Sequence, residues 1–205
     1  MNRGWRAVAV LVSLLGVTAC TTSPPRDVDN ICAIFTEKDD WYDDAEEARE
    51  QWGSPIPVMM AIIYQESRFR ADARPARRKL LGFIPWFRPS TAYGYSQAKT
   101  TTWEEYEDDA GRFGADRDDF ADAIDFVGWY NYQSKRRSGI SLQNTYGLYL
   151  AYHEGHGGYN RATYRQKPWL MAVARKVETR ANTYQAQLMG CEQSLKDSGG
   201  FFGWF

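Results

Sequence analysis

Residues 54–69 read Ser-Pro-Ile-Pro-Val-Met-Met-Ala-Ile-Ile-Tyr-Gln-Glu-Ser-Arg-Phe, and they contain the most apolar predicted helix of the domain. A serine can cap the first turn of a helix and proline is well tolerated in that turn, so Ser54 and Pro55 predict a helix start. The helix is expected over Pro57–Phe69. Its almost wholly apolar composition indicates that it belongs to the core.

Glu66 stands near the end of this apolar run. The residues three and four positions earlier are Ile63 and Ile62, so the carboxylate shares a helical face with core side chains. Desolvation penalises the charged form of a carboxyl group, which raises its pKa and lets it keep a proton near neutral pH. Glu66 is therefore a candidate general acid. The alternative is an ordinary glutamate at a helix end that reaches water.

The rest of the chain is expected to be mainly helical, because apolar residues recur at helical intervals. Further helices are predicted over Phe35–Trp52, Phe120–Ser138, Leu142–His153 and Trp169–Leu188. The segment Thr100–Glu105 has the pattern of a cap followed by a helix. The sequence shows no sustained strand alternation. At most a small β hairpin is expected, near Gly82–Ser96.

Residues 1–19 have the features of a signal peptide. Arg3 and Arg6 give a basic start, and the apolar run Ala7–Val17 is too short to span a bilayer comfortably. The tetrad Val-Thr-Ala-Cys that ends at Cys20 resembles the lipobox of bacterial lipoproteins, which are cut before the cysteine and lipidated on its thiol. The alternative is an ordinary secretory signal. Either signal exports the mature chain.

The chain is expected to have four parts. These are the signal peptide 1–19, the lipidated cysteine and linker 20–30, a globular domain 31–192 and a C-terminal tail 193–205. Thr21, and not Asp, follows the lipidated cysteine, which by the sorting rule of lipoproteins indicates the periplasmic face of the outer membrane. This location assumes a Gram-negative host.

Composition restricts the class of partner. The net charge of −1 becomes −3 once Arg3 and Arg6 are removed, which is not the profile of a nucleic-acid-binding protein. The 8 Trp, 13 Tyr and 10 Phe residues suit stacking on sugar rings, although aromatic side chains more often belong to a core. In an oxidising compartment Cys32 and Cys191 favour one disulfide, the alternative being two buried thiols.

Three short segments, taken together, resemble a known family signature. They are Glu-Ser-Arg-Phe at 66–69, Ser-Thr-Ala-Tyr-Gly-Tyr-Ser-Gln at 90–97 and Ala-Tyr-His-Glu-Gly at 151–155. The soluble-lytic-transglycosylase family shows Glu-Ser-x-Phe, then Ser-x-Ala-x-Gly-Leu-Met-Gln, then Ala-Tyr-Asn-x-Gly. Its members are lysozyme-like enzymes that cleave peptidoglycan. The resemblance covers residues 50–188 and implies a mainly α, goose-type lysozyme-like fold that needs no cofactor.

The resemblance implies a role for each matching residue. Glu66 matches the single catalytic acid/base, and Tyr152 matches a tyrosine whose hydroxyl faces that acid. The residues expected to support the acid or to contact substrate are Ser67, Ser90, Tyr95, Gln97, Tyr152 and His153. Gly94 and Gly155 match backbone positions where close approach or unusual dihedral angles are needed.

The chain also departs from the family pattern. Tyr95 and Ser96 stand where Leu and Met are usual, and His153 replaces Asn. The segment between Glu66 and Gln97 is longer than usual and contains a basic, aromatic insertion over residues 74–88. This insertion fits a membrane surface or a glycan, and the alternative is an ordinary covering loop.

The implied reaction breaks the β-1,4 bond between N-acetylmuramic acid and N-acetylglucosamine. Glu66 would protonate the glycosidic oxygen and then accept a proton from the C6 hydroxyl of the muramoyl sugar, which attacks C1 and closes a 1,6-anhydro ring. A hydrolytic muramidase would instead need a second carboxylate to activate water. The candidates for it are Glu154, Asp72 and Glu104.

The remaining expectations concern partners. A non-catalytic envelope lipoprotein that binds peptidoglycan is the alternative from another functional class. The run His153-Glu154-Gly155-His156 is not His-Glu-x-x-His, so no metal is expected. The expected partners are glycan strands and, through the N-terminal lipid, a membrane. The protein is expected to act as a monomer.

Overall fold

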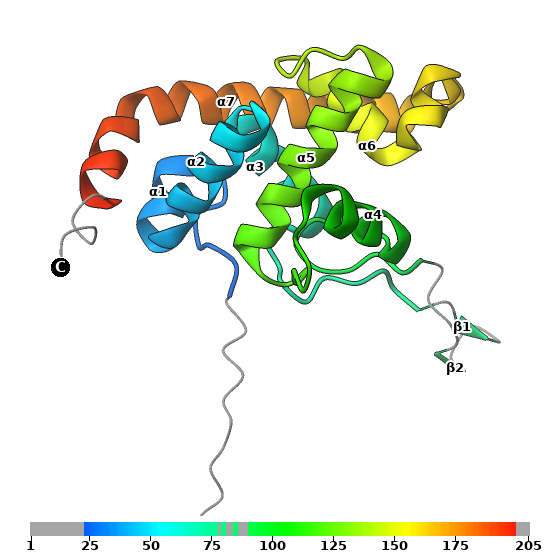
Figure 1. Ribbon diagram of the computed structural model, residues 1–205, viewed down its shortest axis with the longest axis horizontal. Helices are drawn as coiled ribbons and strands as arrows, with labels where there is room; N and C mark the ends of the chain where they lie inside the picture. The colour runs from blue at the N-terminus through cyan, green and yellow to red at the C-terminus, as the bar shows by residue number, and fades with distance from the viewer. Residues whose placement is uncertain (1–22, 78, 81–83, 86–89, 200–205) are drawn as a thin grey trace, which may run out of the picture.

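The computed structural model describes residues 23–77, 79–80, 84–85 and 90–199 (Figure 1). The elements are α1 (Ile31–Glu37), α2 (Asp40–Trp52), α3 (Ile56–Ser67), β1 (Lys79–Leu80), β2 (Ile84–Pro85), α4 (Thr100–Ala110), α5 (Phe120–Ser138), α6 (Thr145–Asn160), the 3-10 helix η1 (Thr163–Gln166) and α7 (Pro168–Gly199). The mainly helical fold predicted from the sequence is confirmed. The predicted signal peptide 1–19 and the predicted lipidation site Cys20 lie outside the described residues.

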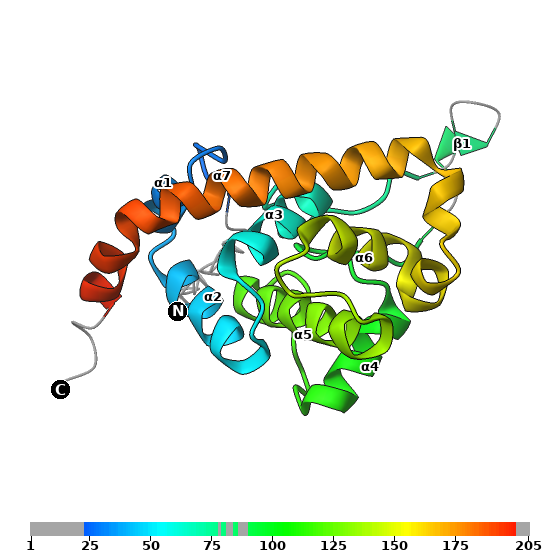
Figure 2. The same ribbon diagram turned by 90° about the horizontal axis from the view of Figure 1, so that it is seen from above.

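Helix α3 lies at the centre of the fold and packs against both α5 and α7 (Figure 2). Its residues Ile56 to Tyr64 are all buried, as the apolar sequence predicted. The predicted cap is wrong. The helix begins at Ile56 after an extended Pro55, and no side chain caps it. The buried Ser54 hydroxyl instead accepts a hydrogen bond from Asn131 Nδ2 of α5 at 2.9 Å. Its hydrogen-bonding partner therefore comes from another helix and not from the first turn of α3.

The end of α3 differs from the prediction in a way that matters for Glu66. The helix stops at Ser67 and not at Phe69, because Arg68 and Phe69 both adopt left-handed backbone angles, with φ of 58° and 57°. The Phe69 ring turns into the core, where it packs against Trp41 at a centroid distance of 5.7 Å. Glu66 therefore sits in the last helical turn, where the chain leaves the apolar interior.

Helix boundaries elsewhere follow the sequence in part. Helix α5 has the predicted bounds, with Asp119 capping its start through the Asp122 amide. The helix predicted over Phe35–Trp52 is divided into α1 and α2 at residues 38–39. Helix α7 continues to Gly199, well beyond the predicted Leu188 and into the segment assigned to the tail.

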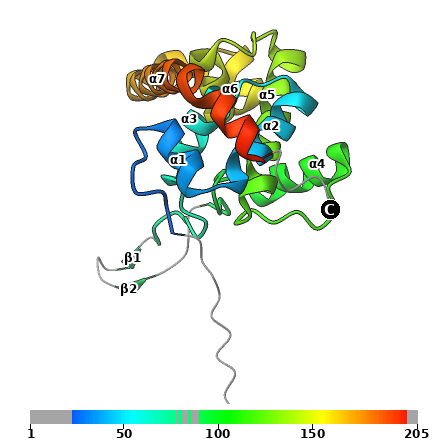
Figure 3. The same ribbon diagram turned by 90° about the vertical axis from the view of Figure 1, so that its left-hand side faces the viewer.

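A disulfide links the two ends of the described domain. Cys32 in α1 and Cys191 in α7, the pair for which the sequence favours a disulfide, are bonded, with their Cα atoms 6.1 Å apart. Figure 3 shows α1 beneath the C-terminal part of α7. Within the described residues, no helix combines the length and apolar character that crossing a bilayer requires.

The hairpin occupies part of the insertion. Strands β1 and β2 pair antiparallel, with Lys79 opposite Pro85 and Leu80 opposite Ile84. The predicted hairpin at Gly82–Ser96 is therefore shifted toward the N-terminus, and residues 78, 81–83 and 86–89 lie outside the described part. The strands stand apart from the helices in Figures 1 and 2.

Candidate active site

Glu66 lies in a pocket of about 350 Å³ that four helices and one loop build together. The pocket is lined by Glu66 of α3, by Gln97, Ala98 and Lys99 before α4, by Thr102 of α4, by Phe126 and Tyr130 of α5, and by Tyr152, His153, Glu154 and Gly155 of α6. The volume is within the range of small-molecule sites. The three sequence segments that resemble the family signature therefore each contribute to one region around Glu66.

The environment of Glu66 favours its protonated form. Burial raises the pKa of Glu66 to about 7, and a hydrogen bond from the Tyr149 hydroxyl opposes this rise. The residue is of intermediate exposure and lines the pocket, so solvent or a ligand can reach it. A carboxyl group of this kind holds a proton at neutral pH and can donate it in a pocket, as a general acid must.

Two tyrosines of α6 lie near the Glu66 carboxyl group, and they have different partners. Tyr149 is buried, and its hydroxyl bonds to Glu66. The Tyr152 hydroxyl, which the family resemblance places facing the acid, donates its hydrogen bond to the Ser96 carbonyl oxygen at 2.7 Å and not to Glu66. Tyr149 is not among the site residues that the sequence predicts. A signal was present, because Tyr149 is three residues before Tyr152 and so shares its helical face.

Replacing Tyr149 by phenylalanine should move the alkaline limb of the activity profile upward by about one pH unit, because a hydrogen bond to a charged group is worth about 1.5–3 kcal/mol. The lost bond favours the ionised form of Glu66, so its pKa should rise further. The measurement is the initial rate of solubilisation of peptidoglycan, the substrate that the sequence resemblance implies, between pH 5 and 9. Tyr146→Phe on the same helix is the control and should leave the profile in place. An unmoved alkaline limb in Tyr149→Phe would contradict this assignment.

The loop before α4 is shaped by a glycine that no other residue could replace. Gly94 has φ of 75°, and a Cβ atom there would lie 1.8 Å from the Arg117 carbonyl oxygen. Gln97 also adopts a left-handed conformation, with φ of 52°. Its Nε2 donates to the carbonyl oxygens of Ala73 and Gly94, both at 2.8 Å. Backbone strain held by such bonds is typical of functional sites.

The other expected site residues separate into two groups. Gln97, Tyr152 and His153 line the Glu66 pocket. Ser67 is buried and donates to the Ile63 carbonyl oxygen at 3.2 Å, which fits its expected support of the helix end.

Ser90 and Tyr95 do not line the pocket. The Ser90 hydroxyl accepts a hydrogen bond from the Ala92 amide. The Tyr95 ring is 1% exposed and packs edge-on against Trp41 and Phe120, so it belongs to the core in this structure.

A second carboxylate, Glu154, lines the same pocket but differs from Glu66 in charge. Burial alone would raise its pKa, yet hydrogen bonds from Lys167, Thr163 and His153 lower the pKa of Glu154 to about 2. The Lys167 Nζ lies 2.7 Å from Glu154 Oε1, and the Glu154 side chain is 4% exposed. Glu154 is therefore ionised, and its carboxylate is held by three neighbouring side chains. The other two proposed second carboxylates, Asp72 and Glu104, are exposed and do not line the pocket.

The two histidines of this segment contact different elements. The His153 ring lies edge-on to Trp169, with ring centroids 5.3 Å apart. The His156 ring stacks on Tyr130 at 4.6 Å, and its Nε2 is 3.0 Å from the Ser134 hydroxyl. Between them Gly155 adopts φ 73° and ψ 158°, a conformation available essentially to glycine alone, which kinks α6. The unusual dihedral angles predicted for Gly94 and Gly155 are thus confirmed.

Known proteins give one informative comparison. Residues 8–191 match the model of one protein family, described as the transglycosylase SLT domain. No curated protein and no solved structure gives a significant match. The match spans most of the chain and includes every helix that lines the Glu66 pocket. The chain therefore belongs to the transglycosylase SLT-domain family, whose lysozyme-like helical fold agrees with the architecture described above.

Proposed function

We propose that this protein is a murein lytic transglycosylase in which Glu66 is the sole general acid/base. The family to which the chain belongs supports a transglycosylase that acts on peptidoglycan. The observation that carries the finer proposal is the raised pKa of Glu66, about 7, in a pocket of four helices. A single carboxyl group with this pKa can donate one proton and accept another within one turnover near neutral pH.

The proposed reaction uses one carboxyl group twice, first as a proton donor and then as a proton acceptor. Protonated Glu66 donates to the glycosidic oxygen between N-acetylmuramic acid and N-acetylglucosamine, and the bond to the muramoyl C1 breaks. The acetamido group of the substrate stabilises the oxocarbenium-like centre. The ionised Glu66 then accepts the proton of the C6 hydroxyl as that oxygen bonds to C1. The product carries a 1,6-anhydro ring, no water is consumed, and Glu66 ends protonated again.

Hydrolysis on the same fold is the second candidate, because Glu154 lines the pocket with Glu66. An inverting hydrolase needs its second carboxylate free to activate water. Glu154 accepts hydrogen bonds from Lys167, Thr163 and His153, and its pKa of about 2 makes it a weak base. These contacts favour transglycosylation and assign Glu154 to the support of the pocket wall.

The deciding experiment is an analysis of the products of digested sacculi. We expect wild type to release muropeptides with 1,6-anhydro ends, lighter by one water than hydrolysis products, as mass spectrometry would show. Glu154→Gln should lower the rate but leave the anhydro ends unchanged. Reducing ends from wild type, together with their loss in Glu154→Gln, would establish the hydrolase instead. Unchanged sacculi would favour a non-catalytic peptidoglycan-binding protein.

We also propose that the mature chain is tethered to the periplasmic face of the outer membrane through Cys20. The support is the signal-like sequence 1–19, the lipobox-like tetrad Val-Thr-Ala-Cys that ends at Cys20, and the Thr21 that follows this cysteine. This tether would keep the Glu66 pocket close to the peptidoglycan layer.

A further inference from the structure

A second cavity lies on the other side of α3 from the Glu66 pocket. It has a volume of about 600 Å³ and is lined by residues of α3 and α7, with Asp29 also contributing. Tyr64 and Arg68 line it, and each is two positions from Glu66 in the sequence. Two helical positions correspond to about 200° of rotation, so Tyr64 projects from the face of α3 opposite to Glu66. The last turns of α3 thus form a wall between the two cavities.

The cavity carries an excess of positive charge. Four cationic side chains, Arg68, Arg175, Lys176 and Arg180, line it together with the single carboxylate of Asp29. Asp29 is paired with Arg180 at 2.8 Å. In the part of the chain that the structure describes, no carboxylate lies within ion-pair distance of the other three cations. This concentration of charge stands in contrast to the net charge of −1 for the whole chain.

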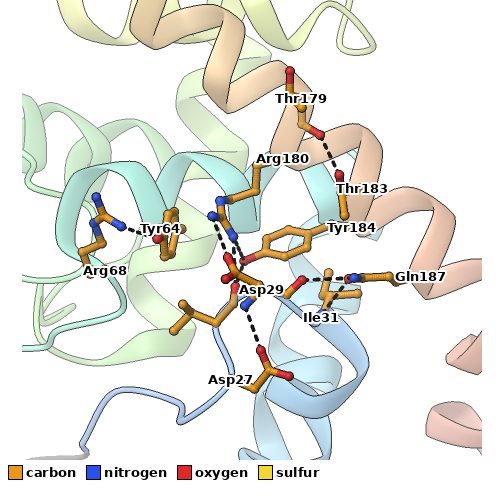
Figure 4. A network of polar contacts seen from close by, with 11 residues as sticks. Asp27, Asp29, Ile31, Tyr64, Arg68, Thr179, Arg180, Thr183, Tyr184 and Gln187 are labelled. Carbon is orange, nitrogen blue, oxygen red and sulfur yellow. Dashed lines mark hydrogen bonds and ion pairs between the residues drawn. The ribbon is translucent and has the colours of Figure 1, made fainter.

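The inner part of the cavity is fixed by stacking and hydrogen bonds (Figure 4). The Arg180 guanidinium carbon lies 3.6 Å from the centre of the Tyr64 ring, and the Arg68 guanidinium carbon lies 4.6 Å from it. Arg180 also donates to the Val28 carbonyl oxygen at 3.0 Å and to the Tyr184 hydroxyl at 3.1 Å. Preorganised guanidinium groups lose little entropy when they bind a planar anion such as a carboxylate.

The neutral groups of the cavity distinguish between anionic ligands. Gln65 adds hydrogen-bond donors and an acceptor beside the cations. The Thr179 and Thr183 hydroxyls donate to the carbonyl oxygens of Arg175 and Thr179 and so offer acceptor positions, and the Asp29 carboxylate adds a further acceptor. Peptide groups need both donors and acceptors, whereas a phosphate needs donors only. The large apolar side chains that are exposed in the described residues, Phe113, Trp169 and Met189, do not line the cavity, so it offers nothing to insert among lipid chains.

We propose that the α3–α7 cavity binds a carboxylate-bearing peptide, namely the peptide stem carried by the muramoyl sugars of peptidoglycan. The identity of this peptide rests on the proposed function. A helix with its side chains is about 10–12 Å across. An extended stem of about four residues spans about 13 Å. The stem is therefore about as long as the helix between the two cavities is wide.

The direct test is a calorimetric titration of the full chain with free tetrapeptide stem at about 0.15 M ionic strength. Arg175→Gln/Lys176→Gln should weaken stem binding about tenfold or more, since two charge-assisted contacts are lost. Lys135→Gln/Arg136→Gln is the matched control, because it removes two adjacent exposed cations from α5 and should leave the Kd unchanged within about twofold. A stem with amidated carboxylates should not bind.

Three outcomes would overturn the proposal. These are equal binding of the amidated stem, equal weakening by the control pair, and binding of anionic phosphatidylglycerol vesicles without any binding of the free stem. The last outcome would identify a membrane-facing surface.

A second measurement separates this inference from the proposed function. The Arg175→Gln/Lys176→Gln protein should show a raised KM for intact sacculi and an unchanged KM for glycan strands stripped of their stems. If wild type forms anhydro ends but binds no stem, the inference fails and the proposed function stands. If wild type binds the stem but forms no anhydro ends, the proposed reaction fails and the cavity remains a peptide site.

Discussion

Replacing Glu66 by glutamine should lower the rate of peptidoglycan cleavage by about 10²–10⁴-fold, the usual contribution of a positioned general acid or base. The amide has nearly the size of the carboxyl group but can neither donate a proton to the glycosidic oxygen nor accept one from the C6 hydroxyl. The measurement is the release of soluble muropeptides from purified sacculi, with sugar ends identified by mass spectrometry. Glu50→Gln, an exposed carboxylate of α2 outside the pocket, should retain wild-type activity.

The same substitution should stabilise the folded protein above neutral pH. The pKa of Glu66 is raised from 4.5 to about 7 in the folded state, so the folded protein binds more protons than the unfolded chain between these values. Stability contributed by this group is therefore fully present below pH 4.5 and is lost as the pH rises through 7. Glutamine never ionises. Glu66→Gln should exceed wild type by up to about 3 kcal/mol at alkaline pH and match it under acid conditions.

Urea unfolding at pH 4.5 and pH 8.5 measures this difference. Asp44 titrates in the same range, because burial and then the neighbouring Asp119 raise its pKa to about 7. Asp44→Asn should therefore remove part of the same pH dependence while leaving the cleavage rate unchanged, which separates the catalytic carboxyl group from a merely buried one. Equal stability of Glu66→Gln and wild type at pH 8.5 would show that Glu66 is well solvated.

The second large effect is expected from the disulfide. Cys32 and Cys191 are separated by 159 positions, and closing a loop of this length in the unfolded chain corresponds to about 4–5 kcal/mol in the chain-entropy treatment. Cys32→Ser/Cys191→Ser should lower the free energy of unfolding by about this amount. Reduced wild type should behave like the double variant in denaturant titrations, and oxidised wild type should not.

The cleavage rate of the double serine variant tests whether the disulfide affects only stability or also the Glu66 pocket. Neither α1 nor the C-terminal part of α7 lines the Glu66 pocket, so the double serine variant should keep its cleavage rate at temperatures where it remains folded. If reduction of the wild type left its unfolding midpoint unchanged, the linkage would have no role in stability. If the variant lost activity while folded, the disulfide would have to act on the pocket at a distance.

Several features of the fold follow from the sequence because their causes are local. The apolar run in α3 has no alternative to burial, so the central helix and the desolvated environment of Glu66 were both predictable. Gly94 and Gly155 adopt backbone angles that disfavour a Cβ, which is a property of single positions. Local rules fail at helix boundaries. They predict that Ser54 caps α3, whereas its hydroxyl accepts a hydrogen bond from Asn131 of α5.

The amino-acid sequence alone predicts a helical domain with a carboxyl group at the end of its most apolar helix. The groups that contact this carboxyl group depend on how the helices pack in three dimensions. Tyr149 rather than Tyr152 donates to Glu66, Lys167 and Thr163 engage Glu154, and Tyr95 turns into the core. The reason is physical: periodicity and backbone preference act over a few residues. Hydrogen bonds, ion pairs and cavities join side chains from different helices, whose relative placement is set by the packing of the whole core.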